Sequence, residues 1–167
     1  DKNSINMVAS FGTGKAGMPM TIPGLDSLAG AIFSAGGLGK HSSDELRTIL
    51  AGRNVGVDFN IGDDSFSLSG STTPKDLDLQ LQLLTAYLTD PGFRPEAERQ
   101  FKAMLPKIYA QLKHTEQGPL SEMSSWFVSN DPRFVFPSED QAKALSSTQV
   151  EDWITPQLTN NALEISI

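Results

Sequence analysis

The sequence lacks several features that would define whole classes of protein. It has no cysteine and two histidines among its 167 residues, which excludes disulfides and thiolate metal sites. No segment approaches the roughly 20 consecutive apolar residues that a membrane-spanning helix needs. Lysine and arginine are scattered singly in a chain of net charge −7, so no basic stripe is present to bind phosphates. We therefore expect no membrane span and no nucleic-acid partner.

What is present is the patterning of one globular domain. Hydrophobic residues make up 38% of the chain, and this length allows a single core to bury roughly 70% of the unfolded surface. Ile5–Phe11 is predicted to be a strand, and the alternation through Val55–Gly70 predicts an antiparallel hairpin. Leu163–Ile167 alternates in the same way, as in a half-buried strand.

Helical spacing and capping signals account for most of the remaining chain. The predicted helices are Gly24–Phe33, Ser42–Gly52, Thr73–Leu88, Pro95–Leu112, Ser121–Val128 and two short helices that begin with capping boxes at Ser138–Gln141 and Thr148–Glu151. Thr73 is the expected N-cap of its helix, with an inward stripe of Leu77, Leu81, Leu84 and Leu88. The next helix is expected to kink at Pro106 and to bury Ala97, Phe101, Met104, Leu105, Ile108 and Leu112.

These elements predict an α+β fold in which an antiparallel sheet has helices packed on one face. The hairpin and the two terminal strands should form one sheet, and the helices around Leu84 and Phe101 should cover it, with both side chains buried. We expect residues 1–167 to form a single domain. The chain starts without methionine and stops on a strand pattern, so we interpret it as a fragment of a longer, multidomain polypeptide.

The order of the elements carries a family resemblance. Gly24-Leu25 opens the first helix and Ala35-Gly36-Gly37 follows it. Gly70–Pro74 comes after the hairpin, and Leu83–Phe93 comes before the helix that starts at Pro95. This order resembles a domain of the insulinase/pitrilysin-type zinc metallopeptidases, over Ile5–Ile167. The resemblance implies the α+β domain shared with the mitochondrial processing peptidases. It also implies a clamshell parent, with two halves of two related domains around a chamber and zinc in the first domain.

The resemblance also implies that the zinc site is missing from this segment. The first helix of active members carries His-x-x-Glu-His, whereas the matching window here reads Ser27-Leu28-Ala29-Gly30-Ala31. A later helix of active members supplies a distal glutamate after a Glu-Arg pair that Glu98-Arg99 resembles, but Gln100–Pro106 contains no carboxylate. We expect no catalytic, cofactor-binding or metal-binding residue in this segment, and zinc in the catalytic domain of the parent.

Two glycine-rich segments are similar to nucleotide-binding motifs. Gly12–Gly17 matches the dinucleotide fingerprint, but that motif must open a helix, and the prolines at 19 and 23 oppose one. Gly36–Lys40 resembles a phosphate loop, but His41 stands where the motif needs serine or threonine to bind magnesium. We interpret the first segment as a mobile loop and the second as a tight bend between helices.

Catalysis by His41, Asp44 and Glu45 ranks last among the functions considered. The two acids fall in the first turn of a capped helix, where carboxylates favour the helix dipole, and a zinc site needs three or four converging ligands. His114 closes a helix, where a partial positive charge is stabilised.

The leading hypothesis is a non-catalytic, chamber-forming domain from the second half of a long bacterial zinc metalloendopeptidase. Its partners would be other domains of the same polypeptide and a peptide or protein substrate. Long bacterial members are often exported, so the parent is expected in the periplasm. The alternative is a stand-alone scaffold or binding module related to the inactive core subunits of mitochondrial complexes. An upstream His-x-x-Glu-His in the same polypeptide would favour the peptidase, and its absence the scaffold.

Two surface segments are candidates for contact with substrate or the opposite half of the parent. They are the acidic turn Gly62, Asp63 and Asp64, and the loop Gly12–Pro23. Both are expected to project from the sheet and have little apolar content. The alternative interpretation of each is an ordinary solvated turn.

Overall fold

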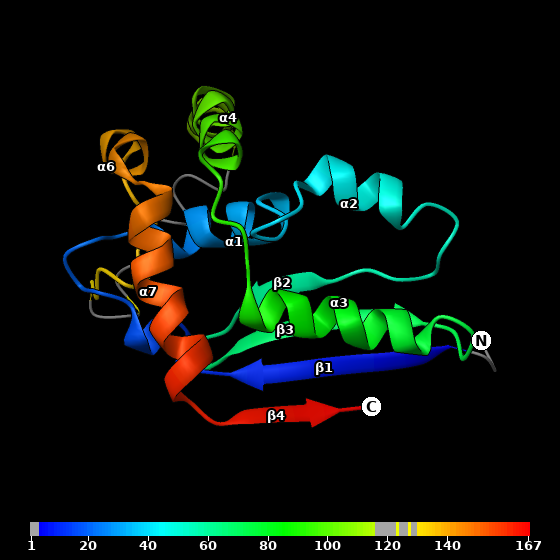
Figure 1. Cartoon of the computed structure of the whole chain (residues 1–167). Helices are drawn as coiled ribbons and strands as arrows, with labels where there is room; N and C mark the ends of the chain where they lie inside the picture. The colour runs from blue at the N-terminus through cyan, green and yellow to red at the C-terminus, as the bar shows by residue number, and fades with distance from the viewer. Residues whose placement is uncertain (1–3, 116–122, 124–126, 128–129) are drawn as a thin grey trace.

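We describe a computed structural model of the chain, covering residues 4–115, 123, 127 and 130–167 (Figure 1). The elements are, in order, β1 (Ile5–Phe11), the 3₁₀ helix η1 (Gly14–Gly17), α1 (Leu25–Ala35), α2 (Ser43–Ile49), β2 (Asp58–Ile61), β3 (Phe66–Thr72), α3 (Leu77–Thr89), α4 (Pro95–Lys113), α6 (Glu139–Ala144), α7 (Ser147–Asn160) and β4 (Leu163–Ser166). Of the predicted helix Ser121–Val128, only Met123 and Phe127 are among the described residues. No helix in this part of the chain is long and apolar enough to cross a membrane.

The strands form one antiparallel sheet in the order β2-β3-β1-β4, so the hairpin and both terminal strands join it as predicted. Phe11, at the end of the central strand β1, pairs with Phe66 of β3 on one side and with Leu163 of β4 on the other. The first arm of the hairpin is shorter than predicted, because β2 begins at Asp58 and the chain before it turns away from β3.

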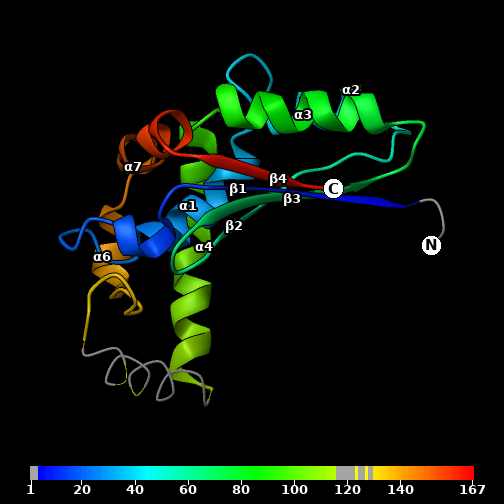
Figure 2. The ribbon, with the colours of Figure 1, turned by 90° about the horizontal axis from the view of Figure 1, so that it is seen from below.

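The two faces of the sheet differ in character. Side chains directly opposite each other share a face, and on the two central strands Ala9, Phe11, Phe66 and Leu68 form the buried part of an apolar face, each at most 4% exposed. Helix α3 lies along this face (Figure 2), and α1 packs against it at β2. The strand residues between them, such as Ser67, point to the opposite face. The predicted α+β class, with helices on one face, is confirmed.

Helix α1 is the centre of the core. Its apolar stripe is fully buried, as its spacing predicts. The ring of Phe33 stacks on Phe59 of β2 at 4.0 Å between centroids and meets Phe93 edge-on at 5.8 Å. These aromatic contacts fix α1 to both the sheet and the connection between α3 and α4.

Helix α3 begins later than predicted and is rotated about its axis. Thr73 is not its N-cap, because the Thr73 carbonyl accepts a bond from the Asp76 N–H (3.0 Å) in a turn that precedes the helix. The buried side chains are Gln80, Leu83, Leu84 and Tyr87. Leu84 is buried as predicted, but Leu81 is 36% exposed. The rotation brings the Tyr87 hydroxyl to the Ser34 carbonyl oxygen at the end of α1 (3.3 Å).

Helix α4 packs against α1 and α6, not across the sheet as predicted. It extends away from the sheet (Figure 2), so only part of its apolar stripe reaches the core. Leu105 is buried as predicted, but Phe101, which was also predicted to be buried, is only half-buried, and Met104, which was predicted to point inward, is 58% exposed. Pro106 lies inside α4, and the kink expected there stays a prediction.

The C-terminal third follows the capping signals with one shift. The box at Ser138 and Gln141 forms as predicted, but the second box joins Ser146 to Gln149, two residues before its predicted position. Three helices, α2, α6 and α7, thus begin with a capping box in which a serine is followed three residues later by glutamate or glutamine. Helix α7 buries Trp153 among its apolar residues, as predicted.

Strand β4 is exposed rather than half-buried. Leu163 and Ile165 pair with Phe11 and Ala9 of β1 and so face the helix-covered side, yet they are 48% and 49% exposed. The helices cover that face over β1 and β3 but leave β4, at the sheet edge, uncovered. The strand was predicted correctly from its alternating pattern, but the burial of its apolar side chains was predicted wrongly.

Candidate functional site

Helices α1 and α4 are the pair that the resemblance places around a zinc site, and they are in direct contact. The resemblance places Ser27 and Ala31 at the positions of the two histidines of the active motif, and Gly30 at the position of its glutamate. Gly30 and Ala31 are exposed, and a side chain added at Gly30 would meet no atom within 4 Å. The two helices therefore pack against each other, and the position of Gly30 faces open space. Among the described residues, no group of three or more His, Asp or Glu could hold a metal ion.

Glu98, the acid of the Glu-Arg pair on α4, has a structural partner. Its carboxylate accepts a bond from the Ser147 N–H at the start of α7 (2.7 Å) and pairs with Lys102 (2.9 Å). The hydrogen bond from Lys102, followed by that from Ser147, lowers the pKa of Glu98 below its usual value. This carboxylate therefore ties α4 to the first turn of α7, where the helix dipole favours negative charge.

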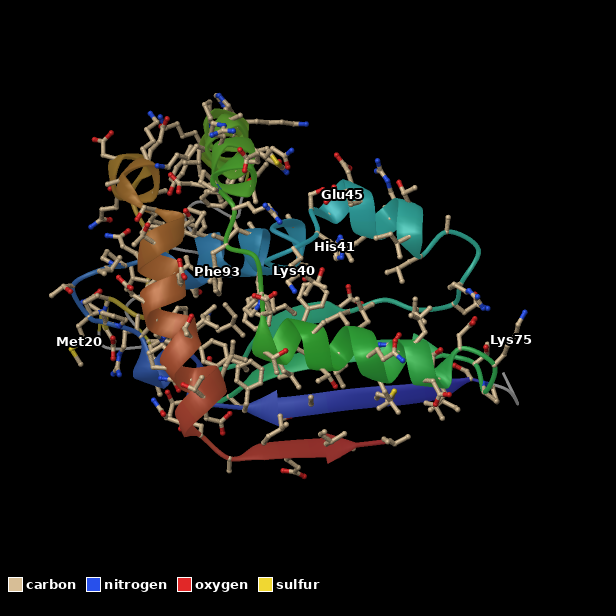
Figure 3. All side chains as sticks on the ribbon, in the orientation of Figure 1. Met20, Lys40, His41, Glu45, Lys75 and Phe93 are labelled. Atoms are coloured by element: carbon tan, nitrogen blue, oxygen red, sulfur yellow. The ribbon has the colours of Figure 1, made fainter. Side chains whose placement is uncertain are left out.

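The acids near His41 are occupied by helix capping. The Glu45 carboxylate accepts bonds from the Ser42 N–H (2.8 Å) and hydroxyl (3.0 Å), and Asp44 pairs with Arg47 (3.0 Å). Figure 3 shows His41 and Glu45 at the start of α2, and both residues are exposed. The hydrogen bonds from Ser42 lower the pKa of Glu45. This arrangement is the solvated cap expected from the sequence.

The second glycine-rich segment forms the tight bend that was predicted between α1 and α2. The bend is clasped by the connection between α3 and α4, because Gly92 donates its N–H to the Gly37 carbonyl (2.9 Å) and Gly39 donates to the Asp90 carbonyl (2.9 Å). Arg94 donates to the Leu38 and Gly39 carbonyls (2.8 and 3.0 Å). The glycines here serve close backbone packing.

The two candidate contact segments are brought together. The Lys15 N–H donates to the Gly62 carbonyl (2.9 Å) and the Ala16 N–H to the Asp63 carbonyl (2.8 Å), so η1 lies across the hairpin turn. Gly14 adopts a φ of 53°, and a side chain there would strike the backbone of Gly62 and Ser65. The segment Gly12–Pro23 was predicted to be an independent, mobile loop. In the structure it instead forms one surface with the acidic turn.

Further contacts hold this surface to the helices. Lys15 pairs with Asp26 in the first turn of α1 (3.0 Å), and Arg133 donates to the Ala16 carbonyl (2.5 Å). Asp131 orients Arg133 through several short bonds, and these bonds lower the pKa of Asp131 to about 2. The side chains of Asp63 and Asp64 remain exposed, so the acidic turn faces solvent from a well-anchored base.

Sequence reasoning missed a polar cluster at the N-terminal end of α3. Gln80, which is fully buried, accepts a bond from the Gly56 N–H (2.9 Å) and donates to the Gly56 carbonyl (2.8 Å). Asp76 accepts bonds from the Asn54 N–H (3.0 Å) and from Arg53 (3.2 Å), and the first of these is the main cause of its lowered pKa. The available signal was a glutamine placed between leucines in a helix, which marks a buried amide in need of partners.

Comparisons with solved structures identify the fold. The ferredoxin protease FusC, in complex with Arabidopsis ferredoxin, matches 98% of this chain with a TM-score of 0.75 and 17% identity. The periplasmic protease PqqL from Escherichia coli matches 99% with a TM-score of 0.76 and 16% identity. The peptidase M16 inactive domain from Pseudomonas fluorescens matches 98% with a TM-score of 0.75 and 12% identity.

The chain spans 18%, 19% and 41% of the lengths of these three structures, respectively. No protein-family model and no curated protein matches it. The likeness covers nearly all of this chain and includes an example described as inactive. The chain therefore has the fold of a pitrilysin-type (M16) peptidase domain.

Proposed function

We propose that this chain is a non-catalytic, chamber-forming domain of a zinc metalloendopeptidase. The observation that carries the proposal is the pair formed by α1 and α4, which keeps the frame of a peptidase domain while Ser27, Gly30 and Ala31 replace the motif residues. Hydrolysis assisted by zinc needs ligands for the metal and a carboxylate near the attacking water. In this proposal both are supplied by another domain of the same polypeptide.

The exposed surfaces support contacts with other domains. Leu163, Ile165 and Ile167 are 48%, 49% and 77% exposed along the edge of the sheet. Neighbouring apolar residues left uncovered in this way are typical of protein interfaces. The chain also spans less than half of the FusC, PqqL and Pseudomonas fluorescens structures, which supports a role inside a larger polypeptide.

The acidic turn and η1 are the proposed contact surface for substrate or the opposite half of the parent. Gly62, Asp63 and Asp64 form its outer part, and the hydrogen bonds from Lys15 and Ala16 hold it in place. A pre-organised surface contributes to binding because it loses little conformational freedom on contact. One matched protease is described as periplasmic, and we propose the same compartment for the parent.

Metal analysis tests the non-catalytic role. We expect the chain, purified without a histidine tag and dialysed against micromolar zinc, to retain far less than one zinc per molecule, because it lacks converging ligands. The double variant Ser27→His/Ala31→His is the positive control, since histidines four residues apart share one face of α1 and should bind zinc detectably. One zinc per wild-type chain, lost in His41→Ala, would overturn the proposal.

A further inference from the structure

Two apolar stripes that the sequence predicted to be buried are uncovered in the structure. On β4, Leu163 and Ile165 face the helix-covered side of the sheet but are 48% and 49% exposed. On α3, Leu81 is 36% exposed although it belongs to the leucine stripe of that helix. Each stripe keeps the apolar spacing of a buried surface and lacks the cover that such a surface has.

The exposed leucines of α3 are turned toward β4. Leu84, which is 2% exposed, marks the side of α3 that faces the sheet. At about 100° per residue, Gln80 and Tyr87 lie to one side of Leu84 around the helix axis. Gln80 bonds to the segment that leads into β2, and Tyr87 bonds to α1, which packs on β2. Leu77 and Leu81 lie to the other side of Leu84, so this flank of α3 faces β1 and β4.

The space over β4 has the width of one helix. Neighbouring strands lie about 4.8 Å apart and packed helices about 8–10 Å apart, so one helix covers two strands. Helix α3 contacts β3, and β4 lies beyond β1 and clear of α3 (Figure 1). A helix laid beside α3 would therefore rest on Leu163 and Ile165, with Leu81 at its flank. A strand added to the edge of β4 would extend the sheet and leave these side chains uncovered.

We propose that an amphipathic helix from another domain of the same polypeptide docks beside α3 and covers β4. That source rests on the proposed function, whereas the fit of a helix rests on the two apolar stripes. Asp78 is the only charged residue of α3, and Glu164 is the only charged residue of β4. Because both charges are negative, lysine or arginine is favoured at the polar edges of the docking helix.

Binding of a designed helix to the 167-residue chain tests the proposal. The probe is an acetylated and amidated 18-residue peptide of leucine, alanine, lysine and glutamine, with leucines spaced three and four residues apart in one stripe. The control peptide has the same composition, with its leucines spread around the helix. We expect the control to bind at least about tenfold more weakly. In methyl NMR of the chain, we expect the probe to shift the signals of Leu81 and Ile165 but not that of Val8.

A pair of lysine substitutions locates the docking surface. Ile165→Lys places a charge on the helix-covered side of β4, and Val8→Lys places the same charge on the opposite face of the neighbouring strand. The two side chains are 49% and 37% exposed, so we expect both variants to fold, which circular dichroism checks. We expect at least about tenfold weaker binding of the probe by Ile165→Lys and unchanged binding by Val8→Lys.

Two other occupants of this surface would give different results. A second copy of the chain would produce a dimer in sedimentation without the probe, and Ile165→Lys would dissociate it. An added strand would slow amide exchange at the outward N–H groups of β4, which a helix packed on the side chains leaves in solvent. Either result, equal binding of both peptides, or equal loss in both variants would overturn the proposal. The zinc measurement does not depend on this surface, so the two proposals fail separately.

Discussion

Replacing Gly36 with alanine is expected to lower the free energy of unfolding by about 3 kcal/mol or more. The backbone of Gly36 is helical, with φ −69° and ψ −18°, so local conformation alone would tolerate or favour alanine. The cost arises from tertiary packing, because the added methyl group would overlap the carbonyl oxygen of Gly92. To relieve that overlap, the bend after α1 must move away from the connection after α3, which breaks the backbone hydrogen bonds between them.

Gly30→Ala is the matched control, because it makes the same chemical change inside α1, the helix that Gly36 caps. Its added methyl group would enter open space, so we expect stabilisation by about 0.5–1 kcal/mol from helix propensity. Urea unfolding of the three proteins, followed by tryptophan fluorescence, measures both effects. Equal and small changes in the two variants would mean that the contact of Gly36 with Gly92 is not present in solution.

The second large effect is expected in helix α3. Leu84 is 2% exposed, and Leu84→Ala should destabilise the chain by about 2–5 kcal/mol, because it removes buried methyl groups and leaves a cavity. Leu81 belongs to the same leucine stripe but is 36% exposed, so Leu81→Ala should cost less than about 1 kcal/mol. Thermal or urea unfolding of the pair checks the helical phase. A loss in Leu81→Ala as large as that in Leu84→Ala would contradict the orientation of α3 in the structure.

This pair also shows how far periodicity reaches. The spacing of leucines predicted correctly that residues 77–88 form an amphipathic helix, and the spacing around Phe33 predicted α1 and its buried stripe. Periodicity did not predict the rotation of α3, because that depends on Gln80 reaching Gly56, twenty-four residues away in sequence. The spacing of apolar residues does not indicate when a polar side chain such as Gln80 is buried together with its hydrogen-bond partners.

Long-range backbone contacts explain the other differences. Two prolines and three glycines predicted a mobile loop after β1, but the bonds from Lys15 and Ala16 to the hairpin turn hold it. Exposure of Met104 and Ile165 follows from where α4 extends and where the helices end over the sheet. None of these contacts has a local signature in the sequence.

The prediction for the candidate site rested mainly on the absence of the His-x-x-Glu-His residues from the first helix. The window of Ser27, Gly30 and Ala31 could be read directly, and the structure places it on α1 beside α4. The structural role of Glu98 could not be read in this way, because its partner Ser147 lies in a helix forty-nine residues further along.

The measurement that most directly tests the proposed role is deletion of residues 1–167 from the full-length polypeptide. Zinc content and kcat/KM are then compared with the intact protein over a peptide library, and the isolated chain is assayed beside them. We predict that the isolated chain cleaves nothing, and that the deleted protein retains its zinc but cleaves more weakly or at different sites, since enclosure contributes to binding and closure. Unchanged kcat/KM and specificity in a deleted protein that remains folded would contradict the account.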